Sequence, residues 1–286
     1  MPLGPKNLER KVKATFVMLV RDKELYGAVS TVQQIEDRFN RHYQYPYVFL
    51  NDKPFTNSFK DVMKRASKAE MIFSVVPTDH WSYPPWISQE RAAEARDTMK
   101  NVIYGYQSGL LVQHEAILPY DYYWRIEPNV KYSCDIEFDP FLYMQNNNKK
   151  FGMTNVSSRV DAYSRCHFWS NFEIVDARWM RGDAFQQYFK HLDQAGGFFY
   201  ERWGDAPVHT IAAALLLSIS EIHFFREIGY YHPPFHNCPA EPELQAKCHC
   251  DPALNVNRER YTCTSKFLEM ANEKRMVYPE ELDDYF

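Results

Sequence analysis

Apolar residues along the chain form short continuous runs that alternate with amphipathic segments. Residues 13–20 are a mostly apolar run (KATFVMLV) long enough for one buried strand, and residues 47–50 (YVFL) form a second. Between them, over residues 28–43, apolar positions recur at intervals of three and four, which predicts an amphipathic helix. A strand, a helix and a strand within about forty residues form a βαβ unit, so the pattern predicts a parallel sheet.

The same two periodicities continue through the rest of the chain. Further strands are predicted at residues 69–76, 135–139 and 222–225, and helices at residues 57–66, 88–100, 109–118, 184–192 and 208–218. Residues 79–87 (DHWSYPPWI) contain two prolines and predict an irregular loop. The pattern as a whole is typical of an α/β protein with helices flanking its sheet.

A short aromatic strand is predicted at residues 121–128 (DYYWRIEP), and the proline that lacks an N–H ends it. Because side chains alternate along a strand, one face carries Tyr122, Trp124 and Ile126 and the other carries Tyr123, Arg125 and Glu127. A carboxylate therefore stands beside an arginine at the carboxyl end of the strand, where open α/β sheets bind ligands. An exposed ion pair between Arg125 and Glu127 is the alternative interpretation.

Other polar side chains stand alone near the ends of predicted elements. Glu173 ends a second aromatic segment (CHFWSNFEI, residues 166–174), and His232 lies in a rigid loop (GYYHPP, residues 229–234). Asp205 precedes a helix and is either its N-cap or a site residue. Arg21, in the polar loop after the first strand, is either a nucleotide contact or part of a solvated turn. Such dispersed groups fit a catalytic site at one sheet edge, but spacing alone does not prove it.

Composition narrows the possible functions. The chain has 286 residues and a net charge of −4, with no basic stripe, so we expect no nucleic-acid partner. No apolar run approaches the roughly 18 residues of a membrane span, and no signal peptide is evident. Aromatic residues make up 16% of the chain, and their clusters suit either a core or a groove for flat-faced ligands such as sugars.

The six cysteines leave two interpretations open. Four of them, Cys238, Cys248, Cys250 and Cys263, lie in the last fifty residues, which predicts either a disulfide-pinned C-terminal lobe or a zinc-stabilised interaction module that includes His249. Only one residue separates the thiols of Cys248 and Cys250, which is fewer than zinc pairs usually have. Disulfides would place the domain in an oxidising lumen, with which the glycosylation sequon at Asn155 is compatible.

Several segments together resemble one family. YYWRIEP, CHFWSNFEI, GGFFYERWGDAPVH, EIHFF followed by GYYHPPFHNCP, and VFLNDKPF are similar to the fungal α-1,2-mannosyltransferases of glycosyltransferase family 15 over residues 14–270. The resemblance implies a GT-A-type α/β fold with a mixed, mostly parallel central sheet. It also implies a lumenal Golgi enzyme that moves mannose from GDP-mannose to a mannoside or glycoprotein acceptor with retention.

The resemblance also assigns roles to individual residues. The EP motif and the loop before the CP pair place Glu127 and His232 as Mn²⁺ ligands. Carboxylate, imidazole and phosphate oxygens suit that ion, which offsets the charge of departing GDP. Glu173 corresponds to the family's proposed nucleophile. In the first route to retention this carboxylate attacks the far face of the sugar, and in the second the leaving group departs and the acceptor enters on the same face. Asp205 is the other catalytic candidate, and the substrate contacts are predicted to be Arg21, Arg125, Trp169 and Asn171.

The sequence departs from the family in two stretches. Residues 104–108 and 153–163 are shorter than usual, and the first lacks a tyrosine and an arginine tied to the donor site. Asn129 also stands where many members have aspartate. Because an arginine on a diphosphate makes strong charge-assisted bonds, the alternative is an inactive relative that binds GDP or mannosides without turnover.

One catalytic domain is expected at residues 13–275, with its cysteine-rich lobe starting near residue 238. Residues 1–12 are expected to be a tail or stem remnant, and residues 276–286 an acidic tail. Any membrane attachment is expected through a segment absent from this chain.

Overall fold

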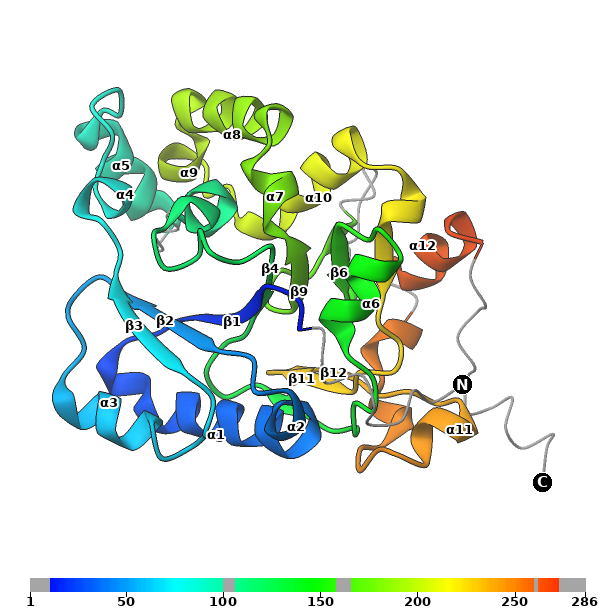
Figure 1. Ribbon diagram of the computed structural model, residues 1–286. Coiled ribbons are helices and arrows are strands. Elements are labelled where there is room, and N and C mark those ends of the chain that lie inside the picture. Colours follow the sequence, from blue (N-terminus) through cyan, green and yellow to red (C-terminus); the bar gives the residue numbers. More distant parts are fainter. Residues whose placement is uncertain (1–10, 100–105, 158–165, 260–261, 273–286) are drawn as a thin grey trace.

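The computed structural model describes residues 11–99, 106–157, 166–259 and 262–272. In that part of the chain a seven-stranded sheet forms the centre of the molecule (Figure 1). Its strands, in spatial order, are β10 (Ile222–Phe224), β6 (Phe151–Met153), β9 (Glu173–Asp176), β4 (Tyr122–Arg125), β1 (Ala14–Leu19), β2 (Tyr47–Asn51) and β3 (Met71–Val75). Only β9 runs antiparallel to its neighbours, so the prediction of a mixed, mostly parallel sheet is confirmed.

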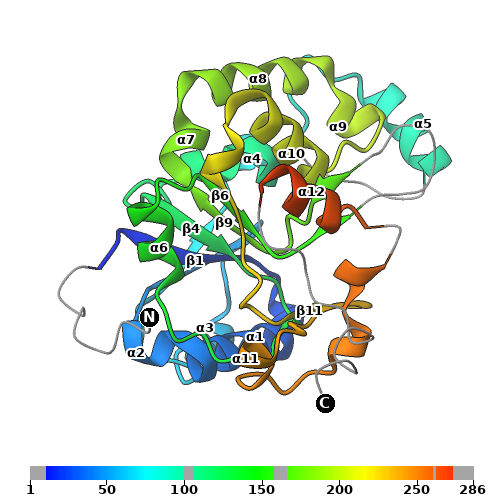
Figure 2. The same ribbon diagram turned by 90° about the vertical axis from the view of Figure 1, so that its right-hand side faces the viewer.

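Helices cover both faces of the sheet (Figures 1 and 2). One face carries α1 (Leu25–Ile35), which continues through a π-helical turn (Glu36–Asn40) into α2 (Arg41–Tyr43), together with α3 (Asn57–Met63) and α6 (Pro140–Asn146). The other carries α7 (Ala177–Arg181), α8 (Asp183–Ala195), α9 (Gly197–Tyr200), α10 (Asp205–Leu216) and α12 (Thr264–Met270). None of these described helices combines the length and the apolar character needed to cross a membrane.

Strand alternation divides the apolar side chains between two cores. Phe16 and Trp124 point into the core on the α1 side, whereas Val17 and Tyr123 point into the core on the α10 side. The faces expected for the central strand are therefore confirmed. Register fixes the strand's place, since Val17 lies opposite Arg125 in the parallel β1–β4 pair.

Three local predictions were wrong. Residues 79–87 were expected to be irregular, but α4 (Thr78–Trp81) enters that range before α5 (Gln89–Met99). Residues 109–118 form a π-helical turn (Tyr106–Leu110) and a 3-10 turn (Leu111–Gln113) instead of one helix. Residues 135–139 are not a strand, because Asp139 accepts hydrogen bonds from the backbone of Phe141 and Leu142 and so caps α6, with proline at its first position.

A smaller sheet lies beside the main one. It contains β5 (Lys131–Tyr132), β11 (Tyr230–His232) and β12 (Phe235–Asn237), and a separate pair joins β7 (Val156–Ser157) to β8 (His167–Phe168). The β11–β12 hairpin turns through Pro233 and Pro234, which are joined by a cis peptide bond. The hairpin carries the predicted metal ligand His232.

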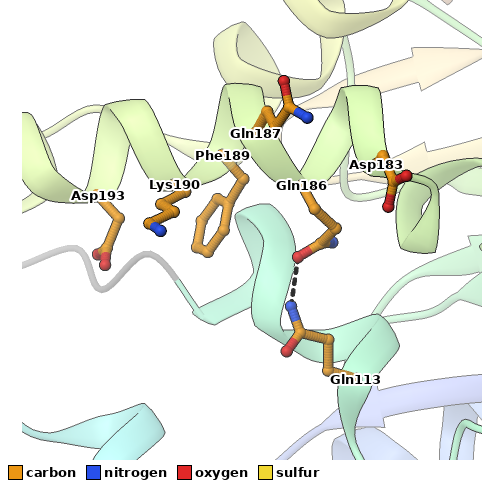
Figure 3. A pocket seen from close by; sticks show the side chains of 7 residues that line it. All are labelled: Gln113, Asp183, Gln186, Gln187, Phe189, Lys190 and Asp193. Carbon is orange, nitrogen blue, oxygen red and sulfur yellow. Dashed lines mark hydrogen bonds between the residues drawn. The ribbon is translucent and has the colours of Figure 1, made fainter.

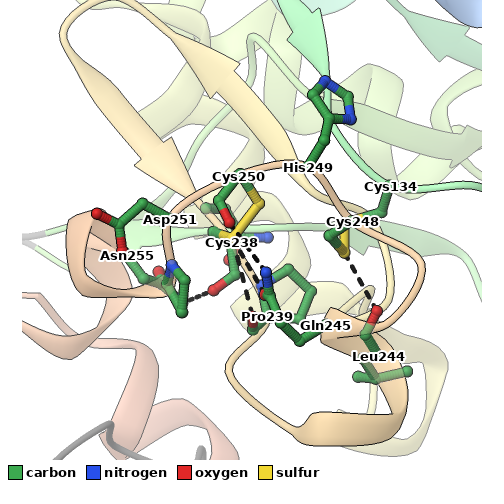
Figure 4. Close-up of a disulfide and its surroundings, with 12 residues drawn as sticks. Cys134, Cys238, Pro239, Leu244, Gln245, Cys248, His249, Cys250, Asp251 and Asn255 are labelled. Carbon is green, nitrogen blue, oxygen red and sulfur yellow. Dashed lines mark hydrogen bonds between the residues drawn. A yellow bond between two sulfur atoms is a disulfide. The ribbon is translucent and has the colours of Figure 1, made fainter.

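All six cysteines are paired in disulfides, so the zinc interpretation was wrong. The pairs are Cys134–Cys248, Cys166–Cys263 and Cys238–Cys250. Two of them tie the lobe that contains α11 (Pro242–Gln245) to itself and to the segment after β5 (Figure 4). The sequon residue Asn155 is only 2% exposed, so this fold does not offer it for glycosylation.

Candidate active site

Arg125 is the centre of a charged cluster just beyond the sheet. One terminal nitrogen donates to Glu127 Oε1 at 2.6 Å, and the other donates to Asp205 Oδ2. Arg125 and Glu127 do form an ion pair, but Arg125 is only 8% exposed, so the alternative interpretation of a pair on an exposed face was wrong. The guanidinium instead bridges two carboxylates that come from distant parts of the sequence.

The helix α10 brings Asp205 to this cluster. Gly204 is the N-cap residue and Asp205 lies in the first turn, where its side chain makes no capping bond, so the N-cap interpretation was wrong. Burial by itself would raise the pKa of the Asp205 carboxyl, but Arg125, His209 and a hydrogen bond with Ser170 lower that pKa to about 2. Asp205 is therefore held as a carboxylate at any physiological pH.

Glu173 lies beside Arg125, as its register partner on the neighbouring antiparallel strand β9. Its side chain is fully buried: Oε1 accepts from the Tyr123 hydroxyl at 2.8 Å, and Oε2 lies 2.8 Å from His209 Nδ1. Burial disfavours the charged imidazole, yet Glu173 and Asp205 outweigh that effect and raise the pKa of His209. Both carboxylate oxygens of Glu173 are thus occupied by side chains of the protein.

Glu127 and His232 form the second half of the cluster. Glu127 Oε2 lies 3.2 Å from His232 Nε2, and both side chains remain partly exposed. Burial would raise the pKa of Glu127, but Arg125 and His232 lower it, and the hydrogen bond to Glu127 raises the pKa of His232. The structure thereby brings together two side chains that the sequence separates by 105 residues.

This donor pair fits a hard divalent ion whose remaining ligands come from elsewhere. A carboxylate oxygen and an imidazole nitrogen suit Mn²⁺. Among the described residues, three or more donors close enough to share an ion occur only at cysteines that are already in disulfides. Glu127 and His232 would therefore leave most coordination positions to phosphate oxygens and water.

Not every predicted site residue joins the cluster. Arg21 is exposed in the loop after β1, at the same carboxyl edge of the parallel strands. Trp169 is partly buried and precedes Ser170 in the chain, while the Asn171 carbonyl accepts a hydrogen bond from the Tyr230 hydroxyl at 2.9 Å. Asn171 Oδ1 is buried and has no hydrogen-bond partner among the described residues.

Sequence analysis missed Tyr123, His209 and Ser170. A signal existed for two of them: Tyr123 shares a strand face with Arg125, and His209 follows Asp205 by four residues and so shares a helix face with it. Ser170 carried no such signal. The shortened stretches at residues 104–108 and 153–163, as well as the expected tails, lie partly or wholly outside the described residues.

A separate hollow of about 340 Å³ lies between α8 and the 3-10 turn at Leu111–Gln113 (Figure 3). Its lining residues are Gln113, Asp183, Gln186, Gln187, Phe189, Lys190 and Asp193. Gln113 donates to Gln186 across it. None of the charged-cluster residues lines this hollow, so the predicted chemistry lies elsewhere.

Open α/β sheets bind ligands beyond the carboxyl ends of their strands, where the carboxylates and the imidazole of the charged cluster lie. Together with its superposition on solved mannosyltransferases, the sheet identifies a glycosyltransferase of the GT-A type. The family model described as "Glycolipid 2-alpha-mannosyltransferase" matches residues 2–158 and 155–272, and the chain belongs to this family. The resemblance noted from the sequence is confirmed.

Relatives and solved structures agree with this assignment. The chain is 42% identical to "Glycolipid 2-alpha-mannosyltransferase 1" of Candida albicans over 94% of its own length and 74% of the relative's. It is 40% identical to "Alpha-1,2 mannosyltransferase KTR1" of Saccharomyces cerevisiae, over 92% and 80%. Core-mannan synthase A of Aspergillus fumigatus, in an "Mn/GDP-form", superposes with a TM-score of 0.84 at 33% identity, covering 92% of this chain and 86% of that one.

The comparison also confirms that this chain lacks internal stretches. The alignment with the Candida albicans relative spans 318 positions, which exceeds the 286 residues of the chain. The two segments of the family match meet at residues 155–158, inside one of the two stretches predicted to be short.

Proposed function

We propose that this protein is a Mn²⁺-dependent, retaining α-1,2-mannosyltransferase that moves mannose from GDP-mannose to a mannoside acceptor on a glycoprotein or glycolipid. The observation that carries the proposal is the cluster of Arg125, Glu127, Asp205 and His232 at the carboxyl edge of the sheet, in a chain of this family. Solved relatives support it, since one is an Mn/GDP form and another, yeast Ktr4p, is in complex with GDP.

Glu127 and His232 are the residues that would hold the ion. When bound there, Mn²⁺ supplies positive charge that offsets the charge on the departing diphosphate. Glu127 suits the role because the charges around it keep it ionised. His232 Nε2 lies 3.2 Å from that carboxylate, and an ion held by both would replace their hydrogen bond, with His232 binding in its neutral form.

Arg125 and Asp205 would orient the sugar and diphosphate. Arg125 donates to both carboxylates and so holds Asp205 in place beside Glu127. Asp205 is ionised and can accept from a sugar hydroxyl. We further propose that Arg21, at the same edge, contacts the donor, and that Trp169 and Asn171 contact the acceptor.

The geometry of Glu173 bears on how the anomeric configuration is retained. To attack the sugar as a nucleophile, Glu173 would have to leave its hydrogen bonds to Tyr123 and His209. We therefore favour a route in which GDP leaves and the acceptor enters on the same face of the sugar. In this route Glu173 stays in its hydrogen bonds and contributes a fixed carboxylate beside Arg125. The nucleophile role remains the competing prediction.

Release of GDP from GDP-mannose tests the proposal. The assay is run with and without methyl α-mannoside, first in Mn²⁺ and then in EDTA. We expect metal-dependent release that the acceptor stimulates. GDP binding without release would favour the alternative, a relative that binds but does not turn over because its two loops are short.

We also propose that the protein acts in the Golgi lumen. Three disulfides agree with an oxidising compartment of the secretory pathway. Co-staining of the tagged full-length protein with a Golgi marker tests this, and a cytosolic distribution would contradict it.

A further inference from the structure

One face of the β11–β12 hairpin connects the protein core to the charged cluster. Residues directly opposite each other on paired strands share a face, and the register pairs Tyr230 with Asn237 and His232 with Phe235. Tyr230 is buried at one end, where its ring packs on Phe172 with centroids 5.2 Å apart. His232 and Phe235 stand at the other end, so Phe235 points to the side on which His232 meets Glu127.

Phe235 differs from Tyr230 on the same face because its ring is exposed. It is 37% exposed, yet it does not stand alone: its centroid lies 5.0 Å from that of Trp169, with the two rings inclined at 63°. Trp169 is itself only partly buried, and the next residue, Ser170, is hydrogen-bonded to Asp205. One ring thus belongs to the cross-strand partner of the predicted metal ligand, and the other belongs to the residue before Ser170, which contacts the predicted catalytic carboxylate.

The segment after Trp169 is anchored to the hairpin. Asn171 Oδ1 has no partner among the described residues, and the Asn171 backbone is fixed by the bond from the Tyr230 hydroxyl. Two inclined aromatic rings on anchored segments suit a pyranoside, which presents an apolar face of C–H groups for stacking.

We propose that Phe235, supported by Trp169, is the platform on which the acceptor mannoside stacks, so that Phe235 determines acceptor affinity. The proposal rests on the proposed function and names a residue for its acceptor side. A sugar stacked on Phe235 would lie beside the predicted metal ligand His232, which is the cross-strand partner of Phe235.

Kinetics of Phe235→Ala test the platform directly. We expect the KM for methyl α-mannoside to rise about tenfold, the size of effect that one aromatic contact gives. The KM for GDP-mannose and the acceptor-independent release of GDP are expected to stay unchanged. Phe235→Trp keeps an aromatic ring and should restore the acceptor KM. Leu254→Ala, which removes exposed apolar surface from the same lobe, should change none of these values.

Two results would overturn the proposal. One is an unchanged acceptor KM in Phe235→Ala. The other is an equal loss of acceptor-independent GDP release, since this would mean that Phe235 acts only through His232. Saturation-transfer NMR of methyl α-mannoside, with GDP and Mn²⁺ present, decides the matter even if the wild type does not turn over. We expect its affinity to fall about tenfold in Phe235→Ala, and no binding by the wild type would also overturn the platform.

Discussion

His209 Nδ1 lies 2.8 Å from Glu173 Oε2, and neither side chain is more than 1% exposed. The pair joins α10 to β9 one helical turn from the place where Asp205 of the same helix meets Arg125 of β4. Because Arg125 and Glu173 are register partners, α10 engages two neighbouring strands through two residues at positions i and i+4. The helix α10 thereby fixes the positions of Arg125 and Glu173 in the site.

The His209–Glu173 pair is expected to stabilise the fold. His209→Ala leaves a buried carboxylate with one unpaired oxygen, so the free energy of unfolding should fall by about 3 kcal/mol or more in urea denaturation. His209→Gln can still donate to Glu173 and should recover part of that loss. The control His191→Ala, at an exposed position on α8, should stay within about 0.5 kcal/mol of wild type. Equal effects of the two alanine variants would contradict the pairing.

Glu173→Gln separates the two routes to retention. If Glu173 only holds the site, transfer should persist within about a hundredfold of wild type, because glutamine preserves the size and the bond from Tyr123. Loss of a nucleophile is far more severe, roughly 10⁴-fold or greater in kcat. A loss of that size with donor affinity unchanged, or a mannosyl-enzyme trapped in mass spectrometry, would establish the nucleophile instead.

Stability should fall in acid through Asp205. The folded-state pKa is about 2, below the ordinary value of 3.8, so the stabilisation is present above pH 4 and is lost as the pH falls towards 2. The shift corresponds to roughly 2 kcal/mol. Urea denaturation at pH 5, 4 and 3 should therefore show a smaller acid-induced loss for Asp205→Asn than for wild type, whereas the exposed-site control Asp61→Asn should track wild type. A parallel decline in all three proteins would contradict the assignment.

Two of the disulfides should differ in how much they contribute to the free energy of unfolding. Cys134–Cys248 spans 114 residues and Cys238–Cys250 spans 12. Because closing a longer loop restricts the unfolded chain more, paired serine substitutions at the first bridge should cost about 5 kcal/mol and at the second about 3 kcal/mol. Urea denaturation measures both, and peptide mapping without reduction verifies the pairing. The reverse order of stabilities, or peptides linking other cysteines, would count against this structure.

The sequence predicted which strand residues belong to the site better than it predicted the residues that contact them from other elements. Strand alternation placed Arg125 and Glu127 on one face because that property is local to the strand. The contacts of His209 and Ser170 depend on how α10 docks against β4 and β9, which no local periodicity encodes. The error at residues 135–139 has a local cause: Asp139 followed by proline was interpreted as the end of a strand, although the same pair starts a helix.

The structure of the product tests the central proposal most directly. GDP-α-mannose and methyl α-mannoside are incubated with the protein in Mn²⁺, and the anomeric configuration and linkage of the disaccharide are determined by NMR. We expect a single α-(1→2) product from wild type and from Glu137→Gln, a surface-pair control, but a loss of at least tenfold in Glu127→Gln, the predicted metal ligand. A β-linked product, GDP release without any disaccharide, or full activity in Glu127→Gln would contradict the proposal.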